Sequence, residues 1–303
     1  MTDAPAVAGL RTYLFTPGDQ QRKLDRASAF RPDALIIDLE DAVPIGLKDN
    51  ARANASEFLA RATLPTFVRV NAAGTPWSTD DVTAVVRPGL TGVVLPMVDD
   101  RDQVTVVAEQ IAVQERATGL APGSVELVIL VETAKGILGV ADIVADQPRV
   151  SAIAFGAYDF ANDMDLVLTE SSLELQMARF QIALAARAYG KVAVDSAFAK
   201  IADIDALVAD TRRARSLGFA GKFCIHPTQI APVAAAFGVS AETLARARRI
   251  VQEFEAGLSR GVAAIIVDGE LVDPPIYDRA KALLASARTW GEPFHHPRRS
   301  GRR

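Results

Sequence analysis

The sequence predicts a closed (β/α)8 TIM barrel followed by a C-terminal helix–hairpin–helix extension. Eight short segments are rich in Val, Ile, Leu and Phe without alternation, which is typical of parallel strands covered on both faces. Segments with apolar residues at three- and four-residue spacing lie between them and indicate helices. Eight such units in roughly 230 residues match this barrel in number and length. An open doubly wound sheet is the alternative, but no Gly-rich Rossmann or P-loop fingerprint follows any predicted strand.

Strands and helices are expected to alternate through residues 1–235, which would form the barrel. The strands are predicted at Thr12–Thr16, Ala34–Asp38, Thr66–Val70, Gly92–Leu95, Glu126–Val131, Ala152–Phe155, Val192–Val194 and Lys222–Ile225. The helices are predicted at Gln20–Phe30, Asp49–Ala62, Pro76–Val86, Asp102–Thr118, Ile137–Asp146, Leu173–Tyr189 and Ile204–Leu217.

Residues 236–303 have a different pattern and are expected to form an extension. Ala241–Leu258 is predicted to be a helix, and Ala263–Val267 and Glu270–Val272 form a hairpin around the turn Asp268-Gly269. Ile276–Arg288 is predicted to be the last helix. The basic end HHPRRSGRR is expected to fray. Such an extension after a complete barrel would serve as a lid or as an oligomer contact.

Composition excludes several classes of protein. Half of the residues are hydrophobic, which allows a sizeable core and excludes a disordered chain. The net charge of −4 argues against a nucleic-acid binder. No apolar run approaches ~20 residues, and the first residues lack the pattern of a signal peptide. The single cysteine, Cys224, excludes an internal disulfide. We therefore expect a cytoplasmic protein that does not span a membrane.

The predicted site lies where the strands end, because active sites of TIM barrels form at that face. Acids are frequent there, while histidine and cysteine are rare, which favours a hard cation such as Mg²⁺ over zinc. The polar residues at or just after strand ends are Asp38, Glu40, Asp41, Arg69, Asn71, Glu132, Asp159, Asp195 and His226.

Glu132 and Asp159 follow neighbouring strands, so their carboxylates are candidates for one Mg²⁺ ion. The alternative is that each carboxylate caps the helix that follows it. Arg69 lies in the apolar segment TFVRVN, where an unpaired charge would be costly. It would bind a carboxylate or stabilise an enolate oxygen, or it would form a structural pair with Asp38 or Asp41.

Two further strand ends carry candidate groups with open roles. The segment IIDLEDAVP places three acids in four residues, which would hold water molecules around a metal, position Arg69, act as a base or simply cap a helix. His226 is expected to make structural hydrogen bonds, and a role as catalytic base is the less favoured alternative. Cys224 is expected in the core.

Six motifs carry a family resemblance between about Arg11 and Ile230. RTYLFTPGD, LIIDLEDAVP, FVRVN, LVILVETAKGI, AFGAYDFANDM and GKFCIHPTQI occur in the order expected for the citrate lyase beta-subunit family, part of the HpcH/HpaI aldolase group of CoA-ester lyases. A weaker similarity follows at VDGELVDPPIYDRA. The sequence therefore resembles this family over most of its length.

The resemblance implies a homotrimeric or hexameric enzyme that binds Mg²⁺, or Mn²⁺ in its place. It implies Glu132 and Asp159 as metal ligands and Arg69 as the substrate-binding and catalytic arginine. It also implies further roles for other matching positions. Arg11, Thr16, Pro17 and Gly18 would belong to the CoA and substrate pocket, Asp38, Glu40 and Asp41 would lie beside the metal with Asp38 or Glu40 as a possible base, and Asp273 would reach the site of a neighbouring subunit.

The activity implied by the resemblance is cleavage or formation of a carbon–carbon bond in a 3-hydroxyacyl-CoA thioester. Malyl-, citramalyl- or citryl-CoA would yield a 2-oxoacid and an acyl-CoA by retro-aldol (Claisen-type) chemistry. The alternatives are a CoA-independent class II pyruvate aldolase, a beta subunit of a multi-subunit citrate lyase, and a malyl- or citramalyl-CoA thioesterase. The sequence Asp195-Ser196-Ala197-Phe198 departs from the family pattern and leaves the substrate open.

Overall fold

The computed structural model describes residues 5–289, which fall into two compact units with a boundary between Phe237 and Gly238. The basic end that the sequence predicts to fray lies outside the described residues. The first unit contains the predicted barrel, and the second contains the predicted extension. Each unit is described by itself below.

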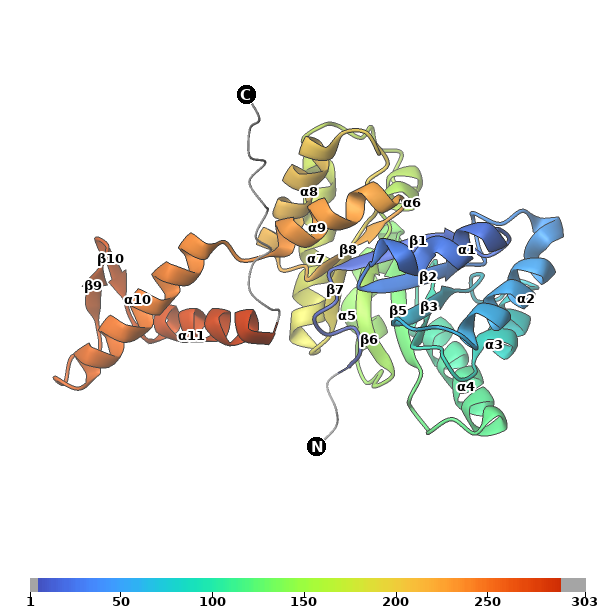
Figure 1. Cartoon of the computed structure of the whole chain (residues 1–303), viewed down its shortest axis with the longest axis horizontal. Helices are drawn as coiled ribbons and strands as arrows, with labels where there is room; N and C mark the ends of the chain where they lie inside the picture. The colour runs from blue at the N-terminus through green and yellow to red at the C-terminus, as the bar shows by residue number, and fades with distance from the viewer. Residues whose placement is uncertain (1–4, 290–303) are drawn as a thin grey trace, which may run out of the picture. The chain divides into compact units, whose positions relative to one another are not determined.

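Eight parallel strands form a closed barrel in the order of the chain, and β1 pairs with β8 to close it (Figure 1). This confirms the predicted fold class and excludes the open sheet. The strands are β1 (Thr12–Pro17), β2 (Ala34–Asp38), β3 (Thr66–Arg69), β4 (Gly92–Leu95), β5 (Glu126–Val131), β6 (Val150–Phe155), β7 (Val192–Asp195) and β8 (Gly221–Cys224).

Helices connect the strands and surround the barrel in Figure 1. The α-helices are α1 (Gln21–Ala27), α2 (Lys48–Leu59), α3 (Ser78–Val85), α4 (Arg101–Thr118), α5 (Ala134–Val144), α6 (Ala157–Asp163), α7 (Gln176–Ala188), α8 (Ile204–Leu217) and α9 (Ile230–Phe237). Single 3₁₀ turns are η1 (Ser28–Phe30), η2 (Ile45–Leu47), η3 (Leu173–Leu175) and η4 (Pro227–Gln229).

The sequence did not predict α6 and α9, for two different reasons. The seven residues of α6 are too few to show a helical repeat. The sequence of α9, IAPVAAAF, has no polar face to alternate with its apolar one. The first predicted helix was also too long, because α1 ends at Ala27 and continues only as η1.

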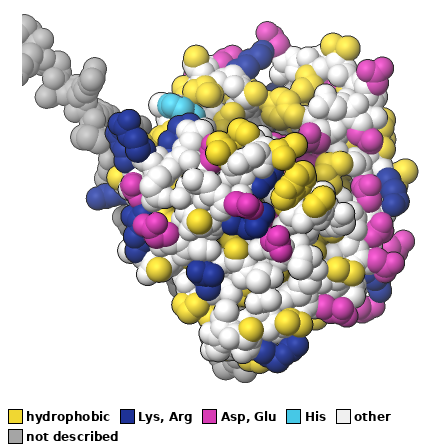
Figure 2. Space-filling view, turned by 90° about the vertical axis from the view of Figure 1, so that its right-hand side faces the viewer, with side chains coloured by type: hydrophobic (Ala, Val, Ile, Leu, Met, Phe, Trp, Pro, Cys, Tyr) yellow, Lys and Arg dark blue, Asp and Glu magenta, His cyan; other side chains and the backbone are white. Residues whose placement is uncertain are grey.

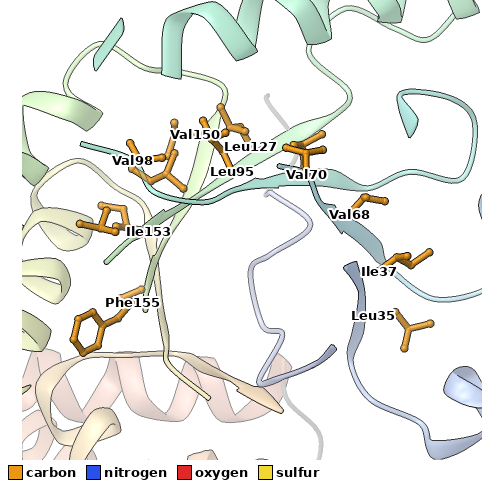
Figure 3. Close-up of a cluster of buried hydrophobic side chains, with 14 of the residues drawn as sticks. Leu35, Ile37, Val68, Val70, Leu95, Val98, Leu127, Val150, Ile153 and Phe155 are labelled. Carbon is orange, nitrogen blue, oxygen red and sulfur yellow. The ribbon is translucent and has the colours of Figure 1, made fainter. Parts of the chain in front are cut away.

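Alternate residues of the strands build two hydrophobic layers. One set, including Ile36 and Phe67, fills the inside of the barrel. The other set packs between the strands and the helices, and Figure 3 draws 14 of its members and labels ten. Because both faces are buried, the strands lack polar alternation, which is the pattern from which the barrel was predicted.

Four charged side chains are buried in the layer between the strands and helices. The guanidinium of Arg179 on α7 binds the carboxylates of Asp195 and Asp210, with nitrogen–oxygen distances of 2.9 and 3.0 Å. The ammonium of Lys222 contacts the same two carboxylates. Burial alone would raise the pKa of Asp210, but Lys222 and Arg179 hold it well below its usual value. Asp195 and Lys222 therefore link β7 and β8 to α7 and α8, and Asp195 is not part of the cavity wall.

Up to residue 289, the second unit has two helices and a hairpin, as predicted. Helix α10 (Ala241–Leu258) is followed by β9 (Ile265–Val267), β10 (Glu270–Val272) and α11 (Pro274–Thr289). A small core of its own includes Ile250 and Phe254, and the Phe254 ring stacks on Tyr277 with centroids 4.6 Å apart. Helix α11 begins two residues earlier than predicted, because proline fits the first turn of a helix.

The face of the molecule in Figure 2 mixes Lys and Arg side chains with Asp and Glu and with hydrophobic ones. No broad area of a single charge covers this face. Between residues 5 and 289, no helix has the length and apolar character needed to cross a bilayer.

Candidate active site

A cavity of about 1140 Å³ lies at the carboxyl ends of the barrel strands. It is lined by residues from the ends of β1, β2, β3, β5, β6, β7 and β8 and from α1. The residues at strand ends that line it are Thr16, Pro17, Asp38, Arg69, Glu132, Asp159, Ser196 and His226. The structure thus brings together most of the predicted site residues, because parallel strands deliver their last residues to one edge.

Glu132 follows β5 and is buried in the cavity wall, with 3% of its surface exposed. Its Oε1 accepts a hydrogen bond of 2.8 Å from the backbone N–H of Met97. Met97 has a φ of +53°, which is unfavourable for a residue with a side chain and which turns its N–H toward the carboxylate. Burial, followed by the charges of Asp159 and Glu40, raises the pKa of Glu132 to about 9. The hydrogen bond from Met97 lowers this pKa, but its effect is smaller than that of burial.

Asp159 lies beside Glu132 because β5 and β6 are neighbours, with Val131 paired to Phe155. It occupies the first turn of α6 and lines the cavity. The alternative helix-capping role does not fit Glu132, since Thr133 caps α5 by accepting a bond from the Gly136 N–H. Asp159 makes no capping bond to α6 either.

Gly156 provides the space that Glu132 occupies. A Cβ at this position would lie 2.1 Å from Oε2 of Glu132 and 2.5 Å from its Cβ. No side chain fits there unless Glu132 moves.

The substitution Gly156→Ala is therefore expected to weaken Mg²⁺ binding by about 10- to 100-fold, the usual cost of losing support for a metal ligand. Titration calorimetry with Mg²⁺ measures this. Gly139→Ala on α5 is the matched control, because its Cβ would meet only ordinary contacts at 3.7 Å or more. Equal Mg²⁺ affinity in the two variants would contradict the role given to Gly156.

Arg69 ends β3 and is held by acids on every side. Its Nε and Nη2 donate to the two oxygens of Asp38, at 2.8 and 2.7 Å. Its Nη1 lies 2.9 Å from Glu40 and 3.4 Å from Asp41, and the guanidinium carbon is 5.0 Å from the centre of the Phe15 ring. Burial alone would lower the pKa of Arg69, but Asp38 and Glu40 raise it well above its usual value. Arg69 therefore stays charged.

Asp38 has no oxygen left for another strong donor. Besides the two bonds from Arg69, Oδ1 accepts from the Glu40 N–H and Oδ2 from the Ala42 N–H, at 3.0 and 3.1 Å. Glu40 contacts Arg69 but does not line the cavity. Through these contacts, Asp38 and Glu40 hold the guanidinium of Arg69 in place.

Lys48 fixes the loop that carries these acids. Its buried ammonium donates to the carbonyls of Leu39 and Glu40, both at 2.7 Å, and to Oδ1 of Asn71 at 2.8 Å. Sequence analysis missed Lys48, Met97 and Gly156. Only the glycine carried a signal, since it directly follows a predicted strand in the motif AFGAYDF, three residues before Asp159.

Besides Glu40, three predicted site residues do not line the cavity. Arg11 precedes β1 at the opposite, amino-terminal end of the barrel, where its N–H donates to Asp33, so its position does not support a role in this pocket. Gly18 packs against the end of β2 and donates its N–H to the Asp38 carbonyl at 2.9 Å. Asp273 lies in the second unit, where Oδ1 accepts from the Ile276 N–H at the start of α11.

His226 and Cys224 have the structural roles expected from the sequence. Nδ1 of His226 contacts the Thr228 hydroxyl at 2.8 Å and accepts from the Thr228 N–H, which caps η4. Cys224 is fully buried in the hydrophobic core, and burial raises the pKa of its thiol to about 12.

The donor set of the cavity fits a divalent cation that prefers oxygen. Burial raises the pKa of Glu40 to about 8, as it raises that of Glu132, and the charge of Asp159 adds to both. The acids outnumber the one arginine among them, so their negative charge needs a further cation to balance it. Mg²⁺ commonly uses one or two protein carboxylates and keeps other positions for water and substrate. Within residues 5–289, no group of three or more His, Cys, Asp and Glu side chains is placed to hold a metal ion. The candidate metal ligands are therefore the two carboxylates of Glu132 and Asp159.

Known proteins resemble this chain over nearly its whole length. A citrate lyase subunit beta-like protein of Deinococcus radiodurans is 36% identical over 94% of this chain and 99% of its own length. A (3S)-malyl-CoA thioesterase of Cereibacter sphaeroides is 33% identical over 91% of this chain and 94% of its own.

A solved structure and a family profile lead to the same assignment. CitE of Mycobacterium tuberculosis, solved with magnesium, acetoacetate and coenzyme A, matches with a TM-score of 0.78 and 30% identity, covering 93% of this chain and 99% of that one. The profile of the HpcH/HpaI aldolase/citrate lyase family matches residues 11–227. The chain is therefore an enzyme of the HpcH/HpaI aldolase/citrate lyase family.

Proposed function

We propose that this enzyme is a Mg²⁺-dependent carbon–carbon lyase acting on a 3-hydroxyacyl-CoA thioester. The observation that carries the proposal is the placement of a carboxylate pair, Glu132 and Asp159, and a fixed cation, Arg69, on one cavity. The CitE structure with magnesium and coenzyme A supports the choice of both ligands. Malyl-, citramalyl- or citryl-CoA would give a 2-oxoacid and an acyl-CoA.

Glu132 and Asp159 would hold the cation, Mg²⁺ or Mn²⁺. When bound, that ion would polarise the substrate's hydroxyl oxygen and the neighbouring carboxylate, which become the keto and carboxylate oxygens of the 2-oxoacid. As the carbon–carbon bond breaks, its electron pair passes to the thioester fragment, which leaves as an enolate. The guanidinium of Arg69 would stabilise the enolate oxygen, because its charge is permanent and Asp38 fixes its plane.

The hydroxyl proton needs an acceptor, and Asp38 is poorly suited because four donors occupy its oxygens. Asp273 stays a candidate if the enzyme is a homotrimer or hexamer in which this residue reaches a neighbouring site. Asp273→Asn would then lower turnover without changing Mg²⁺ affinity. Mixing it with Glu132→Gln chains would restore part of the activity only if the site is shared between subunits.

Hydrolysis of the thioester is the second candidate, favoured by the 33% identity to a malyl-CoA thioesterase. Product analysis separates the candidates. A lyase converts malyl-, citramalyl- or citryl-CoA into glyoxylate, pyruvate or oxaloacetate plus an acyl-CoA, whereas a thioesterase releases the free hydroxyacid and CoA. Mass spectrometry of products formed with Mg²⁺ is the test. Release of the hydroxyacid and CoA without a 2-oxoacid would establish the thioesterase, and turnover of CoA-free hydroxyacids alone would establish a class II pyruvate aldolase.

A further inference from the structure

The segment that follows β7 is held at both of its ends. Asp195, the last residue of the strand, is bound to Arg179 within the buried ion-pair cluster. Three residues later, the carbonyl of Phe198 accepts a hydrogen bond of 2.7 Å from Nε2 of Gln229, whose side chain is fully buried. Ser196 lies between these two anchors and lines the cavity. Its backbone is therefore fixed in the cavity wall.

The hydroxyl of Ser196 bonds to the first residue of α6. Its Oγ accepts a hydrogen bond of 3.1 Å from the Ala157 N–H, and this bond is buried. The hydroxyl donates in turn to the carbonyl of Ala197 at 3.3 Å, which leaves its lone pairs free for the N–H. Ser196 has only 2% of its surface exposed, so water has little access to this bond. The hydroxyl thus joins the end of β7 to the start of α6.

Helix α6 has no cap of its own. The first N–H groups of a helix have no partner within it, and the side chain of the N-cap residue usually supplies one. In α6 the N-cap is Gly156, and a Cβ there would lie 2.1 Å from Oε2 of Glu132. The first bond within the helix runs from the Phe160 N–H to the Gly156 carbonyl. The glycine that makes room for Glu132 therefore removes the usual cap, and Ser196 supplies a replacement from the neighbouring strand.

We propose that Ser196 is a positioning residue for the candidate metal ligand Asp159. This inference rests on the proposed function, in which Asp159 holds the cation. Asp159 stands two residues after Ala157 in the first turn of α6, so fraying of this end would displace its carboxylate. A helix of seven residues has few internal bonds that resist fraying. Tyr158 is tied to the same segment, since its Oη accepts from the Ala199 N–H at 2.8 Å, but water competes with this exposed bond.

The test compares four variants. Ser196→Ala leaves the Ala157 N–H without its partner, and Ser196→Thr is the conservative variant that keeps the hydroxyl. Ser151→Ala is the matched control on β6, because this buried serine bonds through its hydroxyl to no residue that the structure describes. Ser56→Ala is the control for stability, because it loses a bond of 2.8 Å to the Ala84 carbonyl outside the cavity. Titration calorimetry with Mg²⁺ and hydrogen exchange of the α6 amides in metal-free protein are measured for each.

We expect Ser196→Ala to bind Mg²⁺ about tenfold more weakly than wild type, the lower end of the usual cost of losing support for a metal ligand. Its α6 amides should exchange faster than those of wild type, because the helix end opens more often. Ser196→Thr and Ser151→Ala should bind Mg²⁺ as wild type does. Ser56→Ala should unfold at a lower temperature and keep the wild-type Mg²⁺ affinity.

Equal Mg²⁺ affinity in wild type and Ser196→Ala would overturn the positioning role and leave the proposed function intact. An equal loss of affinity in Ser196→Thr would assign the effect to packing, and an equal loss in Ser56→Ala would assign it to overall stability. Either result would also overturn the role. If wild type binds no Mg²⁺, the proposed function fails, whereas exchange of the α6 amides still decides whether Ser196 fixes this helix. The two failures are therefore distinguishable.

Discussion

Replacing Glu132 by glutamine is expected to abolish Mg²⁺ binding and to lower kcat/KM by about a thousandfold or more. This corresponds to losing the several kcal/mol that a bound cation contributes to stabilising charge in the transition state. The amide has the same shape as the carboxyl group and still accepts from the Met97 N–H, so the site keeps its geometry. Calorimetry with Mg²⁺ and a turnover assay measure the two effects.

The same variant separates function from folding. Burial raises the pKa of Glu132 to about 9, so without metal the ionised form is disfavoured in the folded state. As the pH rises from 4.5 toward 9, wild type should lose stability because its Glu132 must ionise in a buried site. Glu132→Gln does not titrate, so it should lose less stability over the same pH range. The metal-free variant should therefore melt at or above the wild-type temperature at pH 9. Full activity of this variant would refute the metal-dependent mechanism.

Lys222→Met is expected to lower the free energy of unfolding by about 3–5 kcal/mol, the usual cost of removing one partner from a buried ion pair. The change leaves Asp195 and Asp210, both buried, with Arg179 as the remaining buried cation. Urea unfolding measures the loss. The folded variant should retain the active-site geometry, because the ion-pair cluster around Lys222 lies in the layer between strands and helices and not in the cavity wall.

Lys135→Met is the matched control for this prediction. Lys135 contacts Asp100 at 3.4 Å, but both side chains are largely exposed, so solvent screens the pair. A much smaller loss of stability is expected than for Lys222→Met. Similar losses for both variants would show that the buried cluster does not stabilise the fold through its charges.

The pattern of the strands was sufficient to predict the barrel. Strands buried on both faces require unbroken apolar segments, and the segment at Ala34–Asp38 was predicted at its exact limits. The elements that were missed, α6 and α9, are short and lack an amphipathic repeat. Lys222 begins a predicted apolar strand, and the pattern does not explain a charge at that position. Its buried partners, Asp195 and Asp210, explain why the charge is tolerated there.

The candidate site was predicted only in part. Glu132, Asp159 and Arg69 were found because each directly follows or ends a strand, and strand order alone makes such residues neighbours. Arg11 belongs to the same motif as Thr16 and Pro17, yet it lies at the other end of β1. A strand of this length separates its two ends by well over 10 Å, so membership of one motif does not place residues in one site.

The amino-acid sequence by itself determined the barrel, the extension and the acids and arginine at the strand ends, because these depend on periodicity and on residue type. Tertiary structure alone decided which groups support them. The N–H of Met97, the missing side chain of Gly156 and the ammonium of Lys48 act on residues up to 35 positions away in the chain. Such long-range contacts leave no local pattern, since their effect depends on distances that exist only after folding.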